Sequence, residues 1–368
     1  MVRAFAVLLA LHGAIHLLGV AKAFGLAALP QLVSPISRSM GVVWLVAAAL
    51  FVAAAIALVV LPRWWWLIAV CAVVASMVAI VAAWSDARAG AVVNVVVLVG
   101  SLFGALAHGP GSLLATYDTD VAQRLARQAS DAPVTDADLA RLPALVQRYL
   151  RTVGVVGHPH VRNFRVTISG RIRSGRDASW MPFSSEQHNV VGDAARFFYM
   201  NASMFLLPVQ GLHRYAGGAA SMRVKAAALV PVVDLSGPEL TQAETVTLLN
   251  DMCIMAPAAL VDAPIAWEAI DAHTVRATFT NAGHTIRADL VFDDDGELID
   301  FLSDDRFKAS EDGRTLRRAR WSTPLAAYRP FGPVRLASRG EGRWHEPGGD
   351  YPYLELEITD VQYNLTPR

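Results

Sequence analysis

The chain has 368 residues, of which 54% are hydrophobic and only 17% are charged, and its formal net charge is zero. A balanced charge excludes the basic surface that nucleic-acid-binding proteins need, and we expect no nucleic acid partner. The two cysteines, Cys71 and Cys253, lie in different halves of the chain, which excludes a disulfide framework. The length allows two or three domains with ample hydrophobic cores.

The first 112 residues have the composition of a membrane domain. Four apolar runs, at 5–29, 40–61, 64–84 and 90–108, each approach or exceed the roughly 20 residues needed to cross a bilayer. Charged side chains are few in this part of the chain: Arg3, Lys22, Arg38, Arg63, Asp86 and Arg88. We therefore predict a four-helix transmembrane domain over residues 1–112 and a multi-pass location in the cell membrane.

Two features of the membrane domain leave alternatives open. Arg3, the first apolar run and Ala21-Lys22-Ala23 imitate a signal peptide with its cleavage site, but the apolar character continues to Leu29. The basic residues that flank the runs are nearly balanced between the two sides of the membrane. The side of the soluble domain therefore stays undecided, with a slight lean toward the extracytoplasmic side.

His12 and His16 lie four positions apart and so share one face of the first predicted helix. Polar side chains in a bilayer are expensive, so a metal, a haem or a proton path is one interpretation. His108 is the only further partner that the runs offer, and the membrane helices contain no carboxylate at depth. We favour hydrogen bonding between helices, and we predict no metal and no cofactor.

The rest of the chain predicts a linker at 113–134, with a short helix at 121–128, and a soluble domain at 135–368. A helix is expected from about residue 136 to 150, capped by Asp136 or Asp138. From residue 161 the apolar period becomes two, which is typical of strands. We expect strands at 161–173, 181–191, 195–202, 211–216, 221–229, 265–269, 274–280, 285–292, 298–304, 315–323, 335–344 and 353–363.

One helix interrupts these strands, at 238–252, with Ser236 as its expected cap and Pro238 in its first turn. The run Asp293-Asp294-Asp295-Gly296 is a hairpin turn, because its acids lack the alternate spacing of a calcium loop. Sequential strands with short turns indicate an α+β domain: a strongly curved antiparallel sheet, a half-barrel, with an inserted helix.

The stretch 195–215 is the most apolar run of the soluble domain. Four consecutive bulky residues, at 197–200, suggest a strand that is apolar on both faces, one toward a core and the other toward a covering element or a cavity. We predict a cavity between this stretch and the inserted helix. The expected wall residues are Phe197, Tyr199, Met204, Phe205, Leu249 and Met252.

A polar cluster is expected beside this cavity. Glu244 and Asp251 are seven positions apart on one face of the inserted helix, and Asp251 lies near the helix end where the dipole disfavours a carboxylate. Arg306 is the expected partner of Asp251, with Asp304 beside it. We interpret the four residues as a structural ionic latch, with acid–base chemistry as the alternative.

Several stretches resemble an uncharacterised family of bacterial membrane proteins that carry a C-terminal domain of unknown function. The matching residues are those at 244–253, 303–306 and 321–324, Tyr363-Asn364, His16-Leu-Leu-Gly19 and Lys22-Ala-Phe-Gly25. The order of strands and helix is also similar to lipoprotein-localisation carriers, which hold acyl chains against an inserted helix. The family implies no activity, and the second likeness concerns architecture alone.

These observations predict a membrane protein whose β domain binds a lipophilic ligand, a lipid or an acyl group, without catalysis. The chain contains no nucleophile elbow, phosphate-binding loop or dinucleotide fingerprint. Two alternatives remain: an enzyme that uses the acidic and arginine cluster on a lipid-like substrate, and a protein-interaction or sensor module. Expected partners are the membrane and a hydrophobic small molecule.

Overall fold

The computed structural model describes residues 2–125, 132–204, 207–310 and 314–367. The chain divides into two compact units, Met1–Thr116 and Tyr117–Arg368. We call them unit 1 and unit 2.

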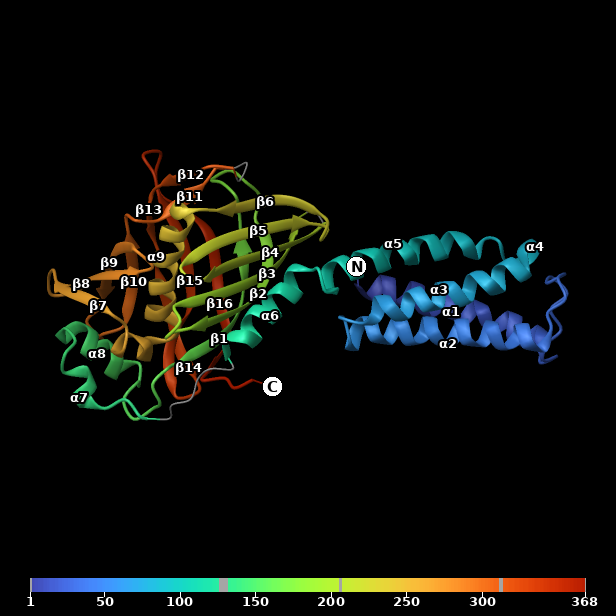
Figure 1. The fold of residues 1–368 in the computed structure, drawn as a ribbon, viewed down its shortest axis with the longest axis horizontal. Helices are drawn as coiled ribbons and strands as arrows, with labels where there is room; N and C mark the ends of the chain where they lie inside the picture. The colour runs from blue at the N-terminus through green and yellow to red at the C-terminus, as the bar shows by residue number, and fades with distance from the viewer. Residues whose placement is uncertain (1, 126–131, 205–206, 311–313, 368) are drawn as a thin grey trace. The chain divides into compact units, whose positions relative to one another are not determined.

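Unit 1 is a bundle of apolar helices. Four of them are long and apolar enough to cross a membrane: α1 (Val2–Ala23), α2 (Arg38–Val60), α3 (Trp65–Ala82) and α5 (Gly90–His108). Helix α1 packs on α2, α2 on α3, and α3 on α5, and the short α4 (Trp84–Ala87) connects the last pair (Figure 1). Helix α1 ends at Ala23 and not at Leu29 as predicted, because Gly25 has a left-handed backbone and the Lys22 ammonium bonds to the carbonyl of Leu32.

The segment after the bundle is more helical than the sequence predicted. Helix α6 (Leu113–Leu125) begins eight residues before the expected short helix, whose last part lies outside the described residues. The expected helix at 136–150 is two helices, α7 (Asp136–Leu139) and α8 (Ala144–Thr152), because Pro143 interrupts the backbone hydrogen bonds. Thr135, and not Asp136 or Asp138, caps α7 in a reciprocal capping box with Asp138.

Unit 2 is built on a large antiparallel sheet, as predicted. Its strands follow the order β6-β5-β4-β3-β2-β1-β16-β15-β13-β10-β9-β8-β7, with β14 also paired to β15. The strands are β1 (Asn163–Ile172), β2 (Met181–Val190), β3 (Ala195–Met204), β4 (Leu207–Ala216), β5 (Ala219–Ala226), β6 (Val230–Ser236), β7 (Ile265–Ala269), β8 (Thr274–Asn281), β9 (His284–Phe292), β10 (Leu298–Ser303), β13 (Arg320–Ser322), β14 (Leu325–Phe331), β15 (Val334–His345) and β16 (Tyr351–Tyr363).

Three strands were not predicted from the sequence. Edge strand β6 contains Pro231. Proline usually interrupts a strand because it lacks an N–H, but it is tolerated on an edge strand, where one side needs no hydrogen-bond partner. Strand β14 was also missed, as was β11 (Phe307–Ala309), which pairs with β12 (Leu316–Arg318) in a separate two-stranded sheet. The expected strand at 315–323 is therefore split between β12 and β13, whereas the predicted turn at Gly296 is present with a left-handed backbone.

The inserted helix α9 (Pro238–Met255) is buried along nearly its whole length, and the strands surround it in Figure 1. It contacts β5 and β6 near one edge of the sheet and β9 and β10 near the other. Strands near the two edges of the sheet also contact each other directly, because Asn281 of β8 donates a 2.6 Å hydrogen bond to the Tyr215 hydroxyl of β4. One hydrophobic core therefore joins α9 to both ends of the strand order.

Candidate functional site

Helix α9 carries an unusual set of polar side chains for a buried helix. Its first turn has Pro238 at the N-terminus and Gly237 at the cap, so the expected Ser236 cap is wrong. Glu244 and Asp251 are only 2% and 3% exposed. Charges buried to this extent must be paired, because an isolated ion in a low dielectric is strongly destabilising.

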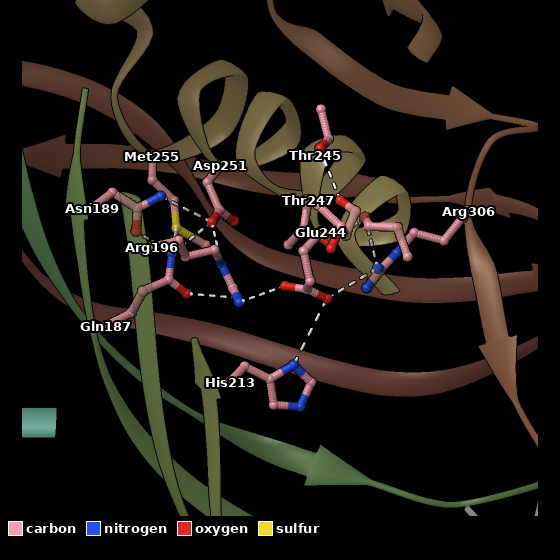
Figure 2. Close-up of polar contacts among 12 residues, drawn as sticks. Gln187, Asn189, Arg196, His213, Glu244, Thr245, Thr247, Asp251, Met255 and Arg306 are labelled. Carbon is pink, nitrogen blue, oxygen red and sulfur yellow. Dashed lines mark hydrogen bonds and ion pairs between the residues drawn. The ribbon is translucent and has the colours of Figure 1, made fainter. Parts of the chain in front are cut away.

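Arg196 of β3 supplies the pairing for both carboxylates. Its Nε lies 2.7 Å from Oδ2 of Asp251, and its Nη1 lies 3.0 Å from Oε2 of Glu244 (Figure 2). Its Nη2 donates to Oε1 of Gln187 at 3.1 Å, and the guanidinium lies 5.1 Å from the centre of the Phe198 ring. The amides of Gln187 and Asn189 on β2 also donate to Oδ2 of Asp251, at 2.7 and 3.1 Å.

Arg306 binds the other oxygen of Glu244, at 3.2 Å from Oε1, and donates to the carbonyl of Ala243 at 2.9 Å. The prediction that Arg306 pairs with Asp251 is therefore wrong, since Arg196 takes that place. Asp304 also lies outside the cluster. Its side chain is exposed, and its backbone carbonyl accepts a hydrogen bond from Arg318. We keep the name latch for Arg196, Glu244, Asp251 and Arg306, which tie α9 to β3 and to the segment after β10.

The two carboxylates of the latch have opposite electrostatic settings. Burial alone would raise the pKa of Glu244, but the nearby His213 ring, Arg196 and Arg306 outweigh burial and hold that pKa well below its ordinary value. For Asp251, burial dominates over the single guanidinium and raises the pKa. Two neighbouring carboxyl groups whose pKa values are displaced in opposite directions are typical of acid–base sites. Here Glu244 accepts from protein donors on both oxygens, and Asp251 accepts three hydrogen bonds on Oδ2.

The expected wall residues are divided between the two faces of β3. Arg196, Phe198 and Met200 face α9, whereas Phe197 and Tyr199 face the opposite side, where Tyr199 lies 5.8 Å from the ring of Tyr117 on α6. The expected residues therefore do not form one wall facing α9. Strand β3 is apolar on both faces, as predicted, but α6 covers the second face.

The remaining wall residues also have separate places. Leu249 and Met252, on α9, are packed in the core at 0% and 3% exposure. Met204 is 39% exposed at the end of β3, and Phe205 lies outside the described residues.

Polar side chains hold α6 on that outer face. Arg214 of β4 makes a two-pronged ion pair with Asp120, with Nε 2.8 Å from Oδ2. The Tyr117 hydroxyl lies 2.6 Å from Nδ1 of His188 and 3.1 Å from Oε1 of Glu186, both on β2. His188 is 6% exposed, and burial, with Arg165 nearby, lowers its pKa to about 4.

An exposed apolar group gathers where β3, β4, β5 and β6 end, and Figure 1 shows the tips of β5 and β6 together. The start of β4 adjoins the β5–β6 turn, because Ala227 donates a 2.8 Å hydrogen bond to the carbonyl of Pro208. We call this group the apolar rim. Its members are 39–60% exposed: Met204, Leu207, Leu229, Val230 and Val232.

In unit 1, His12 and His16 take part in a closed hydrogen-bond network between helices, as predicted. His12 Nε2 donates to Oδ1 of Asn94 at 3.1 Å, and Nδ2 of Asn94 donates to Oγ of Ser76 at 2.9 Å. The Ser76 hydroxyl then donates to Nε2 of His16 at 2.9 Å, and Nδ1 of His16 donates to the carbonyl of His12 at 2.8 Å. The network joins α1, α3 and α5, and no group of three metal-binding side chains occurs among the described residues.

Residues 132–356 match the family described as "Family of unknown function (DUF6544)", which confirms the expected resemblance to a domain of unknown function. A comparison with curated proteins finds no match.

Two solved structures are similar in architecture. A DUF1329 family protein from Desulfovibrio piger is 11% identical, with a TM-score of 0.34 over 64% of this chain and 95% of that one. A LolA superfamily protein from Nitrosomonas europaea is 10% identical, with a TM-score of 0.30 over 59% of this chain and 93% of that one. The second of these names contains the lipoprotein-carrier likeness that the order of elements predicted, and at these TM-scores it carries no further argument.

Proposed function

The chain belongs to a family of unknown function, DUF6544, and from its own residues we propose that unit 2 binds a lipid or an acyl chain without changing it chemically. In this proposal unit 2 is a strongly curved half-barrel around α9, supported by the contact between β4 and β8. The four apolar helices of the same polypeptide tether it to a bilayer.

The observation that carries the proposal is the apolar rim. Five large apolar side chains are exposed at the ends of β3, β4 and β6 and in the β5–β6 turn, in a domain whose other described apolar residues are mostly buried. Contiguous exposed apolar surface usually marks a binding site, since single exposed residues are the norm elsewhere. A membrane-tethered domain meets lipid more often than any other apolar partner.

Lys225 gives the rim a preference among lipids. It is paired in register with Gln210 of β4 and Pro231 of β6, in the strands whose ends carry the rim, and it points to the opposite face of the sheet from Val230. A cation beside an apolar surface favours an amphiphile with an anionic end, such as a fatty acid or an acidic phospholipid.

The latch supports a non-catalytic function. Each carboxylate of the latch is bound by at least one guanidinium, and both lie at most 3% exposed. A general acid or base must reach a substrate proton at hydrogen-bond distance, which these enclosed groups do not.

The rim is tested with a palmitic acid that carries a photoactivatable diazirine, applied to the full chain in detergent. We expect cross-links within residues 204–232, mapped by peptide mass spectrometry. Replacing Leu229 by Gln together with Val230 by Thr should lower labelling by roughly tenfold, because two apolar contacts of about 0.7 kcal/mol each are lost.

The matched control removes two exposed apolar side chains elsewhere in unit 2. Ile299→Gln with Ile270→Thr starts from exposures of 39% and 43%, against 60% and 53% for Leu229 and Val230. This control should label like the natural protein. Equal labelling of both double variants, or cross-links spread evenly over unit 2, would refute the rim as the binding site.

Replacing Lys225 by Met separates charge from apolar contact. We expect about threefold weaker labelling by the fatty acid and no change with its methyl ester, since an exposed ion pair contributes at most about 1 kcal/mol. The salt dependence of labelling should disappear in the variant. A loss of the same size with the ester would show that Lys225 acts through packing instead.

The exposure of the rim also favours a second candidate, a protein-interaction module. In that case the diazirine lipid would label no preferred peptide, while the Leu229 and Val230 double variant would lose a protein that co-purifies with the natural chain. The two functions are therefore distinguished by the same pair of variants.

A further inference from the structure

The helix bundle of unit 1 contains a cavity that the proposed function of unit 2 does not use. Its volume is about 280 Å³, and its walls come from α1, α2, α3, the start of α5 and the loop before α2. Most of the lining is apolar: Ile15, Leu18, Ile36, Trp44, Ile80 and Val93. The volume is near the lower end of the range for small-molecule sites.

Polar groups are gathered at one side of this cavity. The rings of His12 and His16 lie 4.9 Å apart, and the ring of Trp44 lies 5.2 Å from that of His16. All three residues line the cavity and are at most 7% exposed.

The hydrogen-bond network described above leaves two of these groups unused. It engages both ring nitrogens of His16 but only Nε2 of His12, so the tautomer makes Nδ1 of His12 an acceptor. This nitrogen has no hydrogen-bond partner among the described residues. The indole N–H of Trp44 is also buried without a partner there. An unpaired buried donor such as this indole N–H destabilises a fold by about 1–3 kcal/mol, which a ligand can relieve.

The opposite end of the cavity is polar and partly exposed. Asp86 lines it and accepts a 2.7 Å hydrogen bond from the backbone of Ser34. Leu32 lines it too, and its carbonyl accepts from the Lys22 ammonium. An occupant that enters here leaves a charged loop, crosses an apolar middle and reaches the histidine side.

We propose that this cavity binds a small lipophilic hydroxyl compound of the size of a phenol or quinol ring. The hydroxyl hydrogen bonds to Nδ1 of His12, and the hydroxyl oxygen accepts from Trp44, so one functional group satisfies both unused atoms. The ring packs against the aliphatic lining. A plain hydrocarbon tail fits the apolar lining but satisfies neither polar atom.

The test uses para-fluorophenol and para-fluoroanisole, followed by fluorine NMR with the full chain in detergent and empty micelles as the blank. The two probes have similar rings, but the anisole has no hydroxyl hydrogen. We expect saturable binding of the phenol and at least tenfold weaker binding of the anisole, as expected for the loss of one buried hydrogen bond. Equal affinity for the two probes, or no saturable binding of the phenol, overturns the proposal.

Three variants test whether the probe binds in the cavity. Ala87→Leu inserts a larger side chain into the lining, and Ala82→Leu makes the same change at an exposed position of α3. Binding should be lost only in the Ala87 variant. Trp44→Phe keeps an aromatic ring and removes the N–H, so it should weaken both probes several-fold. Unchanged binding in Trp44→Phe, or equal binding in the two alanine variants, contradicts the site.

Discussion

Replacing Arg196 by Met is expected to lower the free energy of unfolding of unit 2 by about 3–5 kcal/mol. The substitution keeps a long side chain but leaves Asp251 and Glu244 without their shared guanidinium, which lies 2.7 and 3.0 Å from them. An uncompensated buried charge destabilises more than the pair ever stabilised. Urea unfolding of the full chain in detergent, followed by tryptophan fluorescence, measures the change.

Two controls define what the Arg196 result means. Arg171→Met breaks the exposed pair with Glu355, 2.6 Å long and 52% exposed on the arginine side, and should change stability by less than about 1 kcal/mol. The triple variant Arg196→Met, Glu244→Gln, Asp251→Asn has no unpaired carboxylate and should recover most of the loss. A single variant no worse than Arg171→Met would show that the latch does not stabilise the fold.

The same variants separate a structural latch from acid–base chemistry. Glu244 and Asp251 have pKa values displaced in opposite directions, which is the feature that favours an enzyme. The triple variant keeps the shape of the site and removes both acids. If the triple variant folds, keeps lipid labelling and loses only a chemical conversion of the lipid, the latch is catalytic and the proposed function is incomplete.

The sequence predicted the parts of this protein that depend on local periodicity. The apolar runs of unit 1 became α1, α2, α3 and α5, and the alternation after residue 161 became antiparallel strands. The consecutive bulky residues of β3 correctly indicated burial on both faces. These features follow from the intrinsic periods of helix and strand, which need no knowledge of distant contacts.

The parts that sequence analysis missed depend on which strands meet across α9. Arg306 was a reasonable partner for Asp251, but the sheet brings Arg196 of β3 to that carboxylate instead. A signal was present: Arg196 stands between Ala195 and Phe197 in a stretch that is otherwise apolar or aromatic up to Met200, and a buried arginine requires an anion. The cover that α6 gives to the outer face of β3 had no comparable local signal.

Acid should destabilise unit 2 through His188. Its pKa is about 4 in the folded protein and 6.5 ordinarily, so between these values the unfolded chain binds a proton that the folded chain excludes. Stability is therefore complete above pH 6.5 and is lost as the pH falls toward 4, by about 3 kcal/mol at roughly 1.4 kcal/mol per pKa unit. Burial is the main cause, with the positive charge of Arg165 second, and the Tyr117 hydroxyl at 2.6 Å fits a neutral ring.

His188→Gln isolates this contribution, because the glutamine amide can still hydrogen bond to the Tyr117 hydroxyl but does not titrate. The natural protein should lose about 3 kcal/mol more than the variant between pH 6.5 and 4, measured by urea unfolding at each pH. His273→Gln, at a position where the side chain is 50% exposed, should follow the natural protein. If the free energy of unfolding of the natural protein and of His188→Gln changes in parallel between pH 6.5 and 4, His188 binds its proton equally well in the folded and the unfolded chain. Protonation of His188 would then not weaken the contact of α6 with β2.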